Sequence, residues 1–322
     1  MYYGLKDKPN VLLLLTPGQW SWAKYFQKFT NTYLLCPKHS TCGVTYKIHR
    51  IPGKVRSLCN VQTEKPFKLL GNIFNSPHNV EYCLDPEKIN MILVFDPIMC
   101  NFNFQKFKNA IKAYWIQDSI YPSSYYNYFY TIGLENYDEI FVAHKNHIKD
   151  YSKYTNHVFW LPYAYDPDVY HPMKVEERYD VSFVGTIDAR RRKVIDAIHS
   201  NFPALRIMVG EFWDHDANYI YNSSKIVLNL TRQNELNWRT FEVLGSGSFL
   251  LNSFSKEVLD LFSDGRDLVM FNDNESLIES IRDLMHNDPK ISEIKKSGHE
   301  KVLNHTFESR TKFVLSVSDM LP

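Results

Sequence analysis

The sequence contains no long hydrophobic run. Among its 322 residues, no stretch approaches the roughly 18 consecutive apolar residues that a membrane-spanning helix needs, so no transmembrane segment is expected. The stretch "MYYGLKDKPNVLLLLTPG" has an apolar core of only five residues. Such a core is too short for a signal peptide, and we expect it to form a first buried strand.

Cysteine is scarce, and low-complexity tracts are lacking. The cysteines are odd in number and all lie in the first third of the chain: Cys36, Cys42, Cys59, Cys83 and Cys100. A reduced, cytoplasmic protein is the simplest expectation. With 44% hydrophobic and 23% charged residues, the chain has the composition of a globular protein.

Two short segments have the spacing of metal ligands. "CPKHSTC" contains Cys36, His39 and Cys42, with Cys59 downstream, and "HKNH" contains His144 and His147. Neither is accompanied by the paired C-x-x-C that a structural zinc site commonly shows. We therefore expect no bound metal.

Charge is unevenly distributed along the chain. Residues 1–165 contain 18 Lys and Arg against 11 Asp and Glu, whereas the remainder contain 19 and 25. The basic excess is concentrated between Trp20 and Leu70 and is interleaved with aromatic residues. This pattern favours an anionic partner for the first half. The alternative is a solvated, lysine-rich face.

Short apolar runs alternate with helical patterns in both halves, which predicts βα units and parallel sheets covered by helices. We expect two doubly wound, Rossmann-like α/β domains, residues 1–163 and 179–322, facing a cleft. A Pro-rich linker, residues 164–178, joins them, and the chain ends in a helical tail. Strands are predicted at residues 10–16, 90–96, 112–118, 139–144, 157–162, 179–185, 205–210, 225–230, 248–252 and 267–271.

The segment "GTIDARRRKVIDAI" predicts an anion site. Gly185 ends a strand, Asp188 can cap the next helix, and the first turn of that helix carries Arg190 to Arg192. Backbone N–H groups at a helix N-terminus bind phosphate, and arginines add forked donors. A diphosphate fits this arrangement, and solvated arginines are the alternative.

The segment "NWRTFEVLGSGSFLLNS" predicts a helix, a tight turn and a strand. Arg239 and Glu242, three residues apart, share one helix face. The carboxylate can accept both hydroxyls of a ribose while the arginine holds phosphate. Gly245 is expected as a left-handed helix cap. A surface ion pair is the alternative.

These residues resemble a known family. "YDVSFVGT…RRR", "NSSKIVLNL…RTFEVLGSGSFLLNS" and "FSDGRDLVMFNDNESLIESIRDLMHNDP" resemble the donor-binding domain of glycosyltransferases with the GT-B fold. The closest likeness is to group-1-type, spore-maturation-protein-like enzymes, over about residues 180–314. The resemblance implies a nucleoside diphosphate sugar donor, of the uridine type, and no metal or other cofactor. It implies that Glu242 holds the ribose, while Arg239 and one of the Arg190–Arg192 group neutralise the diphosphate. The donor-binding candidates are Gly185, Thr186, Arg190, Arg232, Asn237, Arg239, Glu242 and Gly247. Many retaining relatives carry a second glutamate where this chain has Asn234, so the stereochemical outcome stays open.

The first domain is expected to bind the acceptor. Its strand over residues 112–118 delivers Asp118 to the carboxyl end of a sheet, where a carboxylate can act as general base. A helix cap or turn residue is the alternative. The acceptor-binding candidates are Gly18, Gln19, Trp20, Trp115 and Tyr121.

Three functions remain open. The first is transfer of a sugar to a surface polysaccharide, cell-wall polymer or protein. The second is glycosylation of a hydroxylated pyrimidine in DNA by an enzyme of the phage type, for which the basic first half is an argument. The third is a non-catalytic nucleic-acid-binding protein on a glycosyltransferase-like scaffold.

Overall fold

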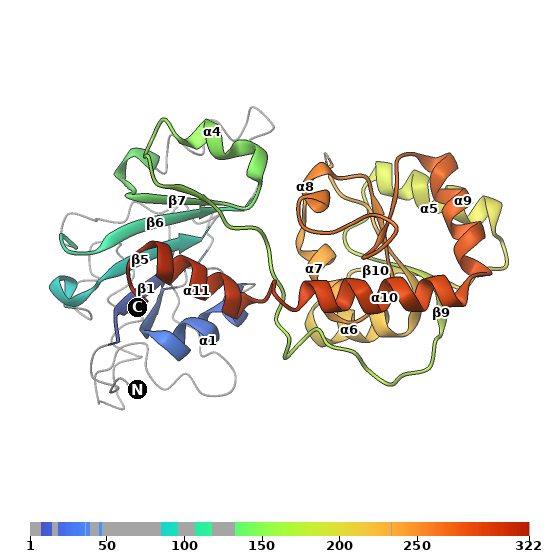
Figure 1. The fold of residues 1–322 in the computed structure, drawn as a ribbon, viewed down its shortest axis with the longest axis horizontal. Helices are drawn as coiled ribbons and strands as arrows, with labels where there is room; N and C mark the ends of the chain where they lie inside the picture. The colour runs from blue at the N-terminus through green and yellow to red at the C-terminus, as the bar shows by residue number, and fades with distance from the viewer. Residues whose placement is uncertain are drawn as a thin grey trace. The chain divides into compact units, whose positions relative to one another are not determined.

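The computed structural model describes residues 8–14, 19–35, 37–38, 45–46, 85–95, 107–117, 133–232 and 234–321. The chain divides into two compact units (Figure 1). The first unit comprises Met1–Pro162 and Thr311–Pro322, and the second comprises Tyr163–Arg310. The sequence placed the whole helical tail in the second domain, whereas its last residues group with the first unit.

The first unit contains a six-stranded parallel sheet with the order β2-β1-β5-β6-β7-β8. Every residue of β5 is buried, as in a strand covered on both faces. The strands are β1 (Asn10–Leu14), β2 (Asn31–Leu35), β5 (Met91–Phe95), β6 (Ile111–Ile116), β7 (Glu139–Val142) and β8 (Val158–Trp160). A separate antiparallel pair joins β3 (Pro37–Lys38) to β4 (Thr45–Tyr46).

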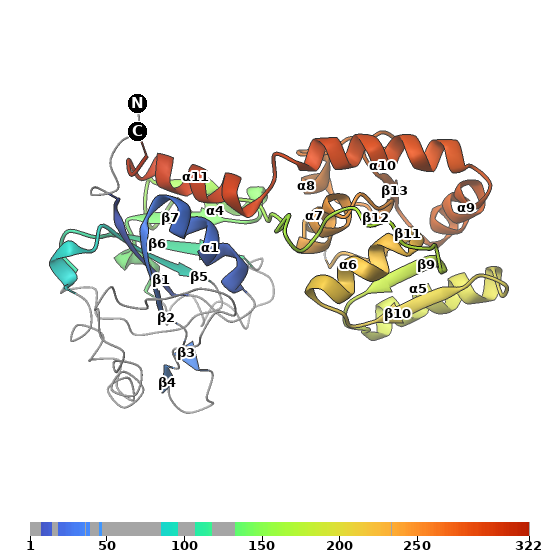
Figure 2. The ribbon, with the colours of Figure 1, turned by 90° about the horizontal axis from the view of Figure 1, so that it is seen from below.

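Helices α1 (Trp20–Phe29) and α11 (Phe307–Val317) lie side by side along this sheet (Figures 1 and 2). The Lys312 ammonium lies 5.5 Å from the centre of the Phe29 ring. The hydroxyl of Ser318 donates to the carboxylate of Glu139 at 2.7 Å, which ties the end of the chain to β7. The shorter elements of this unit are η3 (Pro86–Lys88), η6 (Leu134–Asn136), η7 (Lys145–His147) and α4 (Ile148–Tyr151).

The second unit contains a five-stranded parallel sheet with the order β10-β9-β11-β12-β13. Because the chain passes from β9 outward to β10 and then returns to the other side of β9, the order reverses between β9 and β11. Open sheets of this kind bind ligands at the carboxyl ends of the strands beside such a reversal. The strands are β9 (Tyr179–Val184), β10 (Ile207–Gly210), β11 (Ser224–Asn229), β12 (Leu250–Ser253) and β13 (Val269–Phe271).

Helices pack around this second sheet. Helix α5 packs against α9, α6 against β9, β11 and α7, and α10 against both α7 and α9. The core includes Val181 and Phe183 of β9, Ile226 and Leu228 of β11, and apolar residues of α5, α9 and α10. The helices are α5 (Ala189–Asn201), α6 (Asp214–Asn222), α7 (Trp238–Gly245), α8 (Lys256–Leu259), α9 (Asn274–Met285) and α10 (Asp288–Val302).

Side-chain caps start most of these helices. Asp188 accepts from Arg191 N–H at 2.8 Å at the start of α5, as predicted. Asn237 and Asp273 do the same for α7 and α9, at 3.2 and 2.8 Å. The last three helices are separated at residues 286–287 and 303–306.

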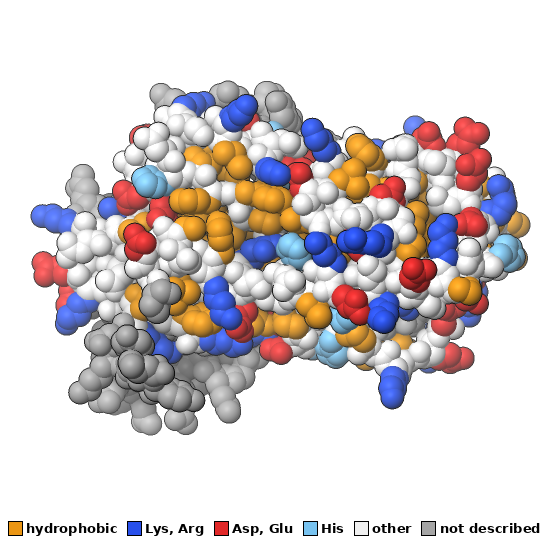
Figure 3. Space-filling model, viewed as in Figure 1, with side chains coloured by type: hydrophobic (Ala, Val, Ile, Leu, Met, Phe, Trp, Pro, Cys, Tyr) orange, Lys and Arg blue, Asp and Glu red, His pale blue; other side chains and the backbone are white. Residues whose placement is uncertain are grey.

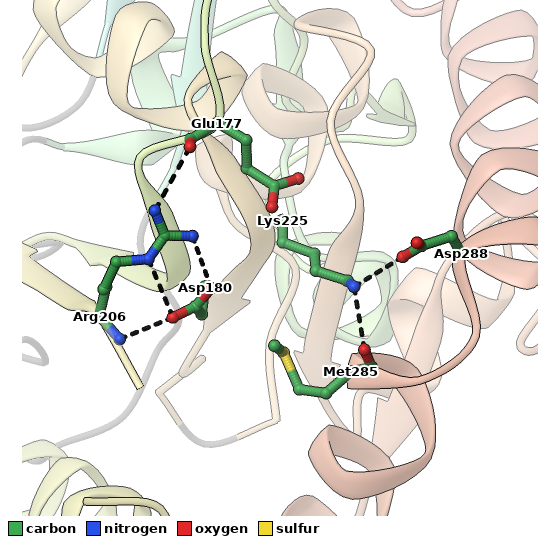
Figure 4. A network of polar contacts seen from close by, with 6 residues as sticks. All are labelled: Glu177, Asp180, Arg206, Lys225, Met285 and Asp288. Carbon is green, nitrogen blue, oxygen red and sulfur yellow. Dashed lines mark hydrogen bonds and ion pairs between the residues drawn. The ribbon is translucent and has the colours of Figure 1, made fainter. Parts of the chain in front are cut away.

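A polar network fastens the amino-terminal edge of the second sheet (Figure 4). Arg206, just before β10, forms a forked pair with Asp180 of β9, with Nη2 and Nε at 2.7 and 3.2 Å from its oxygens. Lys225 of β11 pairs with Asp288 at 2.6 Å and donates to the Met285 carbonyl at 3.0 Å. These contacts stabilise the edge opposite the carboxyl ends.

All ten predicted strands are present, so the predicted pair of doubly wound parallel sheets is confirmed. Strands β2, β3 and β4 were not predicted. β2 is the edge strand of the first sheet, and its first three residues are half-buried. It therefore lacks the continuous apolar run that marked the others.

Candidate functional site

The candidate site lies at the carboxyl edge of the second sheet, where β9, β10 and β11 end. Gly185 follows β9 and donates its N–H to the carbonyl of Gly210, the last residue of β10, at 2.8 Å. Leu230 and Thr231 follow β11, on the other side of β9. The loops after three adjacent strands therefore meet beside the reversal of strand order.

Gly185 allows an arginine to approach the backbone. Its φ is +142°, a conformation that side-chain-bearing residues rarely adopt. A Cβ at this position would collide with Nη2 of Arg239 and lie 3.2 Å from Cζ of that residue. The sequence predicted both residues at one site, and the structure brings them into contact.

Arg239 is held by a buried amide. Its Nη1 donates to Oδ1 of Asn229 at 2.9 Å, and its Cζ lies 5.1 Å from the centre of the Phe183 ring. Its buried Nε has no hydrogen-bond partner among the described residues. The guanidinium is fixed on one side and keeps donor capacity.

Arg191 is the most enclosed arginine of the group, with 6% of its surface exposed. Its Nη1 donates to the Thr186 carbonyl at 2.8 Å and its Nη2 to the Leu230 carbonyl at 2.9 Å. Its Cζ lies 5.5 Å from the centre of the Phe183 ring, which it shares with Arg239. Arg191 therefore joins the loops that follow β9 and β11.

Two exposed arginines, Arg190 and Arg232, complete the group. Arg190 donates from Nη2 to the Thr231 carbonyl at 2.6 Å. Burial, and then the charges of Arg239, Arg232 and Arg190, lower the pKa of Arg191 to about 10, against which Asp188 acts in the opposite direction. The charges of the other three guanidinium groups therefore act on Arg191. We call Arg190, Arg191, Arg232 and Arg239 the arginine cluster.

The arginine cluster carries a local excess of positive charge, since of the residues that the structure describes only Asp188 and Glu242 act electrostatically on its members as opposite charges. On the face of the second unit drawn in Figure 3, acidic and basic side chains are interspersed. Among the described residues, by contrast, no carboxylate forms an ion pair with any member of the cluster. The half of the chain that contains the cluster has more acidic than basic residues. A local excess of cations within it is suited to binding an anion.

A buried amide network supports the cluster and was not predicted. Asn229, which is fully buried, donates to Oδ1 of Asn252 at 2.7 Å and exchanges bonds with Asn237 at 3.0 Å. The same amide accepts from Arg239. Asn229 and Asn252 are paired in register on β11 and β12. Asn237, predicted as a donor-binding residue, caps α7 and belongs to this network.

Glu242 lies among tyrosines. Its Oε2 accepts from the hydroxyl of Tyr221 at 3.2 Å, and the Tyr170 hydroxyl also acts to lower the pKa of the carboxyl group. Burial raises the pKa of Glu242, against the opposing effects of the Arg239 charge and of these two hydroxyls. The residue is half-buried.

Two other donor-binding candidates have structural contacts of their own. Gly247 has φ +66° and donates to the Leu244 carbonyl at 3.0 Å, so it ends α7 in the left-handed conformation. The sequence assigned that cap to Gly245, which is helical instead and lies against the Tyr165 ring. Thr186 is exposed, and its carbonyl accepts a hydrogen bond from Nη1 of Arg191.

Two of the acceptor candidates, Gly18 and Tyr121, lie outside the described residues, and so does the predicted base Asp118. Trp115 is fully buried, packs edge-on against Trp22 with ring centres 4.6 Å apart, and donates to the Leu161 carbonyl at 3.0 Å. We therefore assign Trp115 to the core instead of to acceptor contact. Gln19 is buried at the start of α1, and Trp20 is the first residue of that helix.

No metal-binding group of three or more His, Cys, Asp or Glu side chains occurs in the part of the chain that the structure describes. His147 pairs with Asp150 at 3.0 Å. The cysteines and His39 lie outside that part. No described helix is long and apolar enough to cross a membrane.

Comparisons with known proteins agree with this geometry. Residues 187–316 match the model of the family described as Glycosyl transferase-like. No curated protein matches the chain. Among solved structures, a glycosyltransferase from Rickettsia africae superposes with a TM-score of 0.68 at 11% identity, covering 97% of this chain and 98% of the other.

Two further structures are similar over the whole chain. A sucrose-phosphate synthase from Thermosynechococcus elongatus gives a TM-score of 0.64 at 10% identity, covering 97% of this chain and 98% of the other. HepE of Anabaena gives a TM-score of 0.65 at 9% identity, covering 97% of this chain and 100% of the other. The chain therefore has the GT-B fold, and its second unit resembles group-1-type glycosyltransferases; the spore-maturation subtype stays a prediction.

Proposed function

We propose that this chain is a glycosyltransferase that moves a sugar from a uridine diphosphate sugar to a hydroxyl group of an acceptor. The observation that carries the proposal is the arginine cluster around Gly185, at the edge where an open sheet binds its ligands.

The cluster can neutralise a diphosphate leaving group. Arg239 and Arg191 are each held by hydrogen bonds to fixed oxygens, so they need little rearrangement when charge develops on the departing phosphate. Each charge-assisted hydrogen bond contributes about 1.5–3 kcal/mol net. Preorganised cations of this kind favour the transition state over the bound substrate.

Glu242 is suited to hold the donor's ribose. An ionised carboxylate offers about four acceptor positions. The hydroxyl of Tyr221 occupies one, and others remain for the adjacent ribose hydroxyls. The bond from Tyr221 also fixes the orientation of the carboxylate.

Structural neighbours support a uridine nucleotide. HepE of Anabaena has been crystallised with UDP and glucose and with UDP-glucose. The pneumococcal O-GlcNAc transferase GtfA, with a TM-score of 0.51 at 12% identity, has been crystallised with UDP and GlcNAc. On this basis uridine is the nucleoside we propose.

The acceptor is proposed to be an anionic polymer, because residues 1–165 carry the basic excess. A surface glycan, cell-wall polymer or protein is the first choice, and DNA carrying a hydroxylated pyrimidine is the alternative. Asp118 is proposed as general base, since it follows the end of β6 by two residues. Asp118→Asn should abolish turnover and leave UDP binding unchanged; unchanged turnover would exclude this role.

Calorimetric titration of the intact chain with UDP tests the proposal. We expect wild-type binding and at least a roughly tenfold loss for Arg239→Ala, the effect of one charge-assisted hydrogen bond. Arg206→Ala is the matched control, because this arginine pairs with Asp180 at the opposite edge. Absence of affinity for any nucleoside diphosphate would refute the proposal and leave the non-catalytic scaffold.

The acceptor is tested separately. Mass analysis of products, with UDP sugars offered to DNA and to cell-wall extracts, identifies the polymer modified. Binding of duplex DNA should weaken steeply with salt if phosphates are contacted. If the affinity for duplex DNA did not change with salt concentration, the DNA alternative would be excluded.

A further inference from the structure

Trp213 stands out among the exposed side chains of the second unit. With 69% of its surface exposed, it is the most exposed large hydrophobic residue among those described. Other aromatic residues of this unit, such as Phe183 and Tyr221, are buried. An indole left in water at this level forgoes the stability that its burial would give.

The position of Trp213 places it at the candidate site. It lies three residues after Gly210, whose carbonyl accepts the N–H of Gly185 at 2.8 Å. The intervening Phe212 packs back on β10, since a Cβ at Gly210 would lie 2.6 Å from its ring. Trp213 therefore belongs to the loop that leaves the same sheet edge as the arginine cluster.

The residue after Trp213 connects this loop to Glu242. Asp214 has φ +52°, a conformation uncommon for a residue other than glycine, and it opens α6. Its charge raises the pKa of both Glu242 and Tyr170, after larger effects of burial. The loop therefore lies within electrostatic reach of the carboxylate assigned to the ribose.

We propose that Trp213 forms the stacking platform for the nucleobase of the donor. The inference rests on the proposed function and extends it from the diphosphate and ribose to the base. A nucleoside diphosphate carries its base beyond the ribose, on the side away from the phosphates. An exposed indole on the loop at the same sheet edge offers the flat apolar surface that a base needs.

Stacking is tolerant of base identity because every base has a π face. Trp213 should therefore contribute affinity for uridine and guanosine diphosphates alike, and none for inorganic pyrophosphate, which has no base. This difference separates Trp213 from residues that hold the phosphates.

Calorimetric titrations of the intact chain with UDP, GDP and inorganic pyrophosphate test the inference. For Trp213→Ala we expect the Kd for UDP to rise about 5- to 150-fold, as for loss of one stacked base, with a similar factor for GDP. The pyrophosphate Kd should stay within about twofold, since phosphate contacts are unaltered. Trp213→Phe should restore most of the UDP affinity because a smaller ring still stacks.

Leu303→Ala is the matched control, since Leu303 is also exposed, at 53%, and follows α10. Should Trp213→Ala bind UDP like the wild type, or weaken UDP and pyrophosphate equally, the inference is overturned while the proposed function stands. If the wild type binds neither UDP nor pyrophosphate, both fail. Thermal melting of each variant checks folding, and quenching of wild-type fluorescence by UDP that persists in Trp213→Phe would also count against stacking.

Discussion

Gly185→Ala tests the geometry of the candidate site most directly. Two effects are expected from this single methyl group. The backbone φ of +142° becomes strained, and the new Cβ occupies the space of the Arg239 guanidinium. Because Arg239 Nη2 cannot remain where it is, the side chain must move away from the loop after β9.

The two effects have different magnitudes and different readouts. Backbone strain at such a position costs on the order of 1–3 kcal/mol of folding stability. Displacing Arg239 removes about one charge-assisted hydrogen bond to the diphosphate, roughly 1.5–3 kcal/mol, which corresponds to a loss of about 10- to 150-fold in UDP affinity. The loss of affinity depends on the collision and not on the strain.

Gly265→Ala separates strain from collision. Gly265 also has a positive φ, +73°, but a Cβ there would meet no atom within 4 Å. Thermal melting should show a loss of stability in both variants, whereas calorimetry should show reduced UDP affinity only in Gly185→Ala. Equal UDP affinity in the two variants would refute the contact between Gly185, Arg239 and the diphosphate.

Two further predictions concern titratable groups. Because burial raises the pKa of Glu242, its ionised form destabilises the fold, and the free energy of unfolding falls as pH rises above the unfolded pKa of 4.5. Glu242→Gln should therefore melt no lower than the wild type at pH 8, yet lose about tenfold in UDP affinity. Equal UDP affinity in the variant and the wild type would exclude a role of Glu242 in holding the ribose. Burial, with the Arg310 charge second, lowers the pKa of His305 to about 4, so stability should fall as pH drops from 6.5 to 4, by at most about 3 kcal/mol. His305→Gln should flatten this slope in urea unfolding at several pH values, and the exposed His215→Gln should not; an unchanged slope in His305→Gln would exclude His305 as its source.

Local patterns predicted the parts of the site that lie close together in sequence. Gly185, Asp188 and Arg190 occupy one strand–turn–helix segment, and the cap by Asp188 was predicted from residue type and position. Arg239 was placed at the same edge because the order of elements resembles a known family. For the first three residues one segment contains the information needed, whereas Arg239 required the resemblance over about residues 180–314.

Contacts between distant segments were beyond the sequence. Asn229 and Asn252 each end an apolar strand, and only the register of β11 with β12 makes them neighbours. The bond from Tyr221 to Glu242 likewise depends on the packing of α6 against α7. Such pairings are set by tertiary structure, to which single-segment periodicity is blind.

The helix cap was assigned to Gly245 instead of Gly247 because two nearby glycines both suit that position. Gly245 and Gly247 both have the residue type that a left-handed cap favours. The choice falls on Gly247 because the Tyr165 ring lies where a side chain at 245 would be, 2.6 Å from a Cβ, so Gly245 is required for close packing instead. Similarly, an aromatic-rich segment does not reveal that Trp115 faces the core.

The arginine cluster is costly to the folded protein. Arg191 is buried and repelled by Arg239, and the buried Nε atoms of both residues lack partners among the described residues. Unpaired buried donors and like charges each oppose folding. An apolar or paired substitute would stabilise the loops after β9 and β11 at least as well. A diphosphate supplies the missing negative charge and acceptors, so the cost is explained if the site is occupied during function.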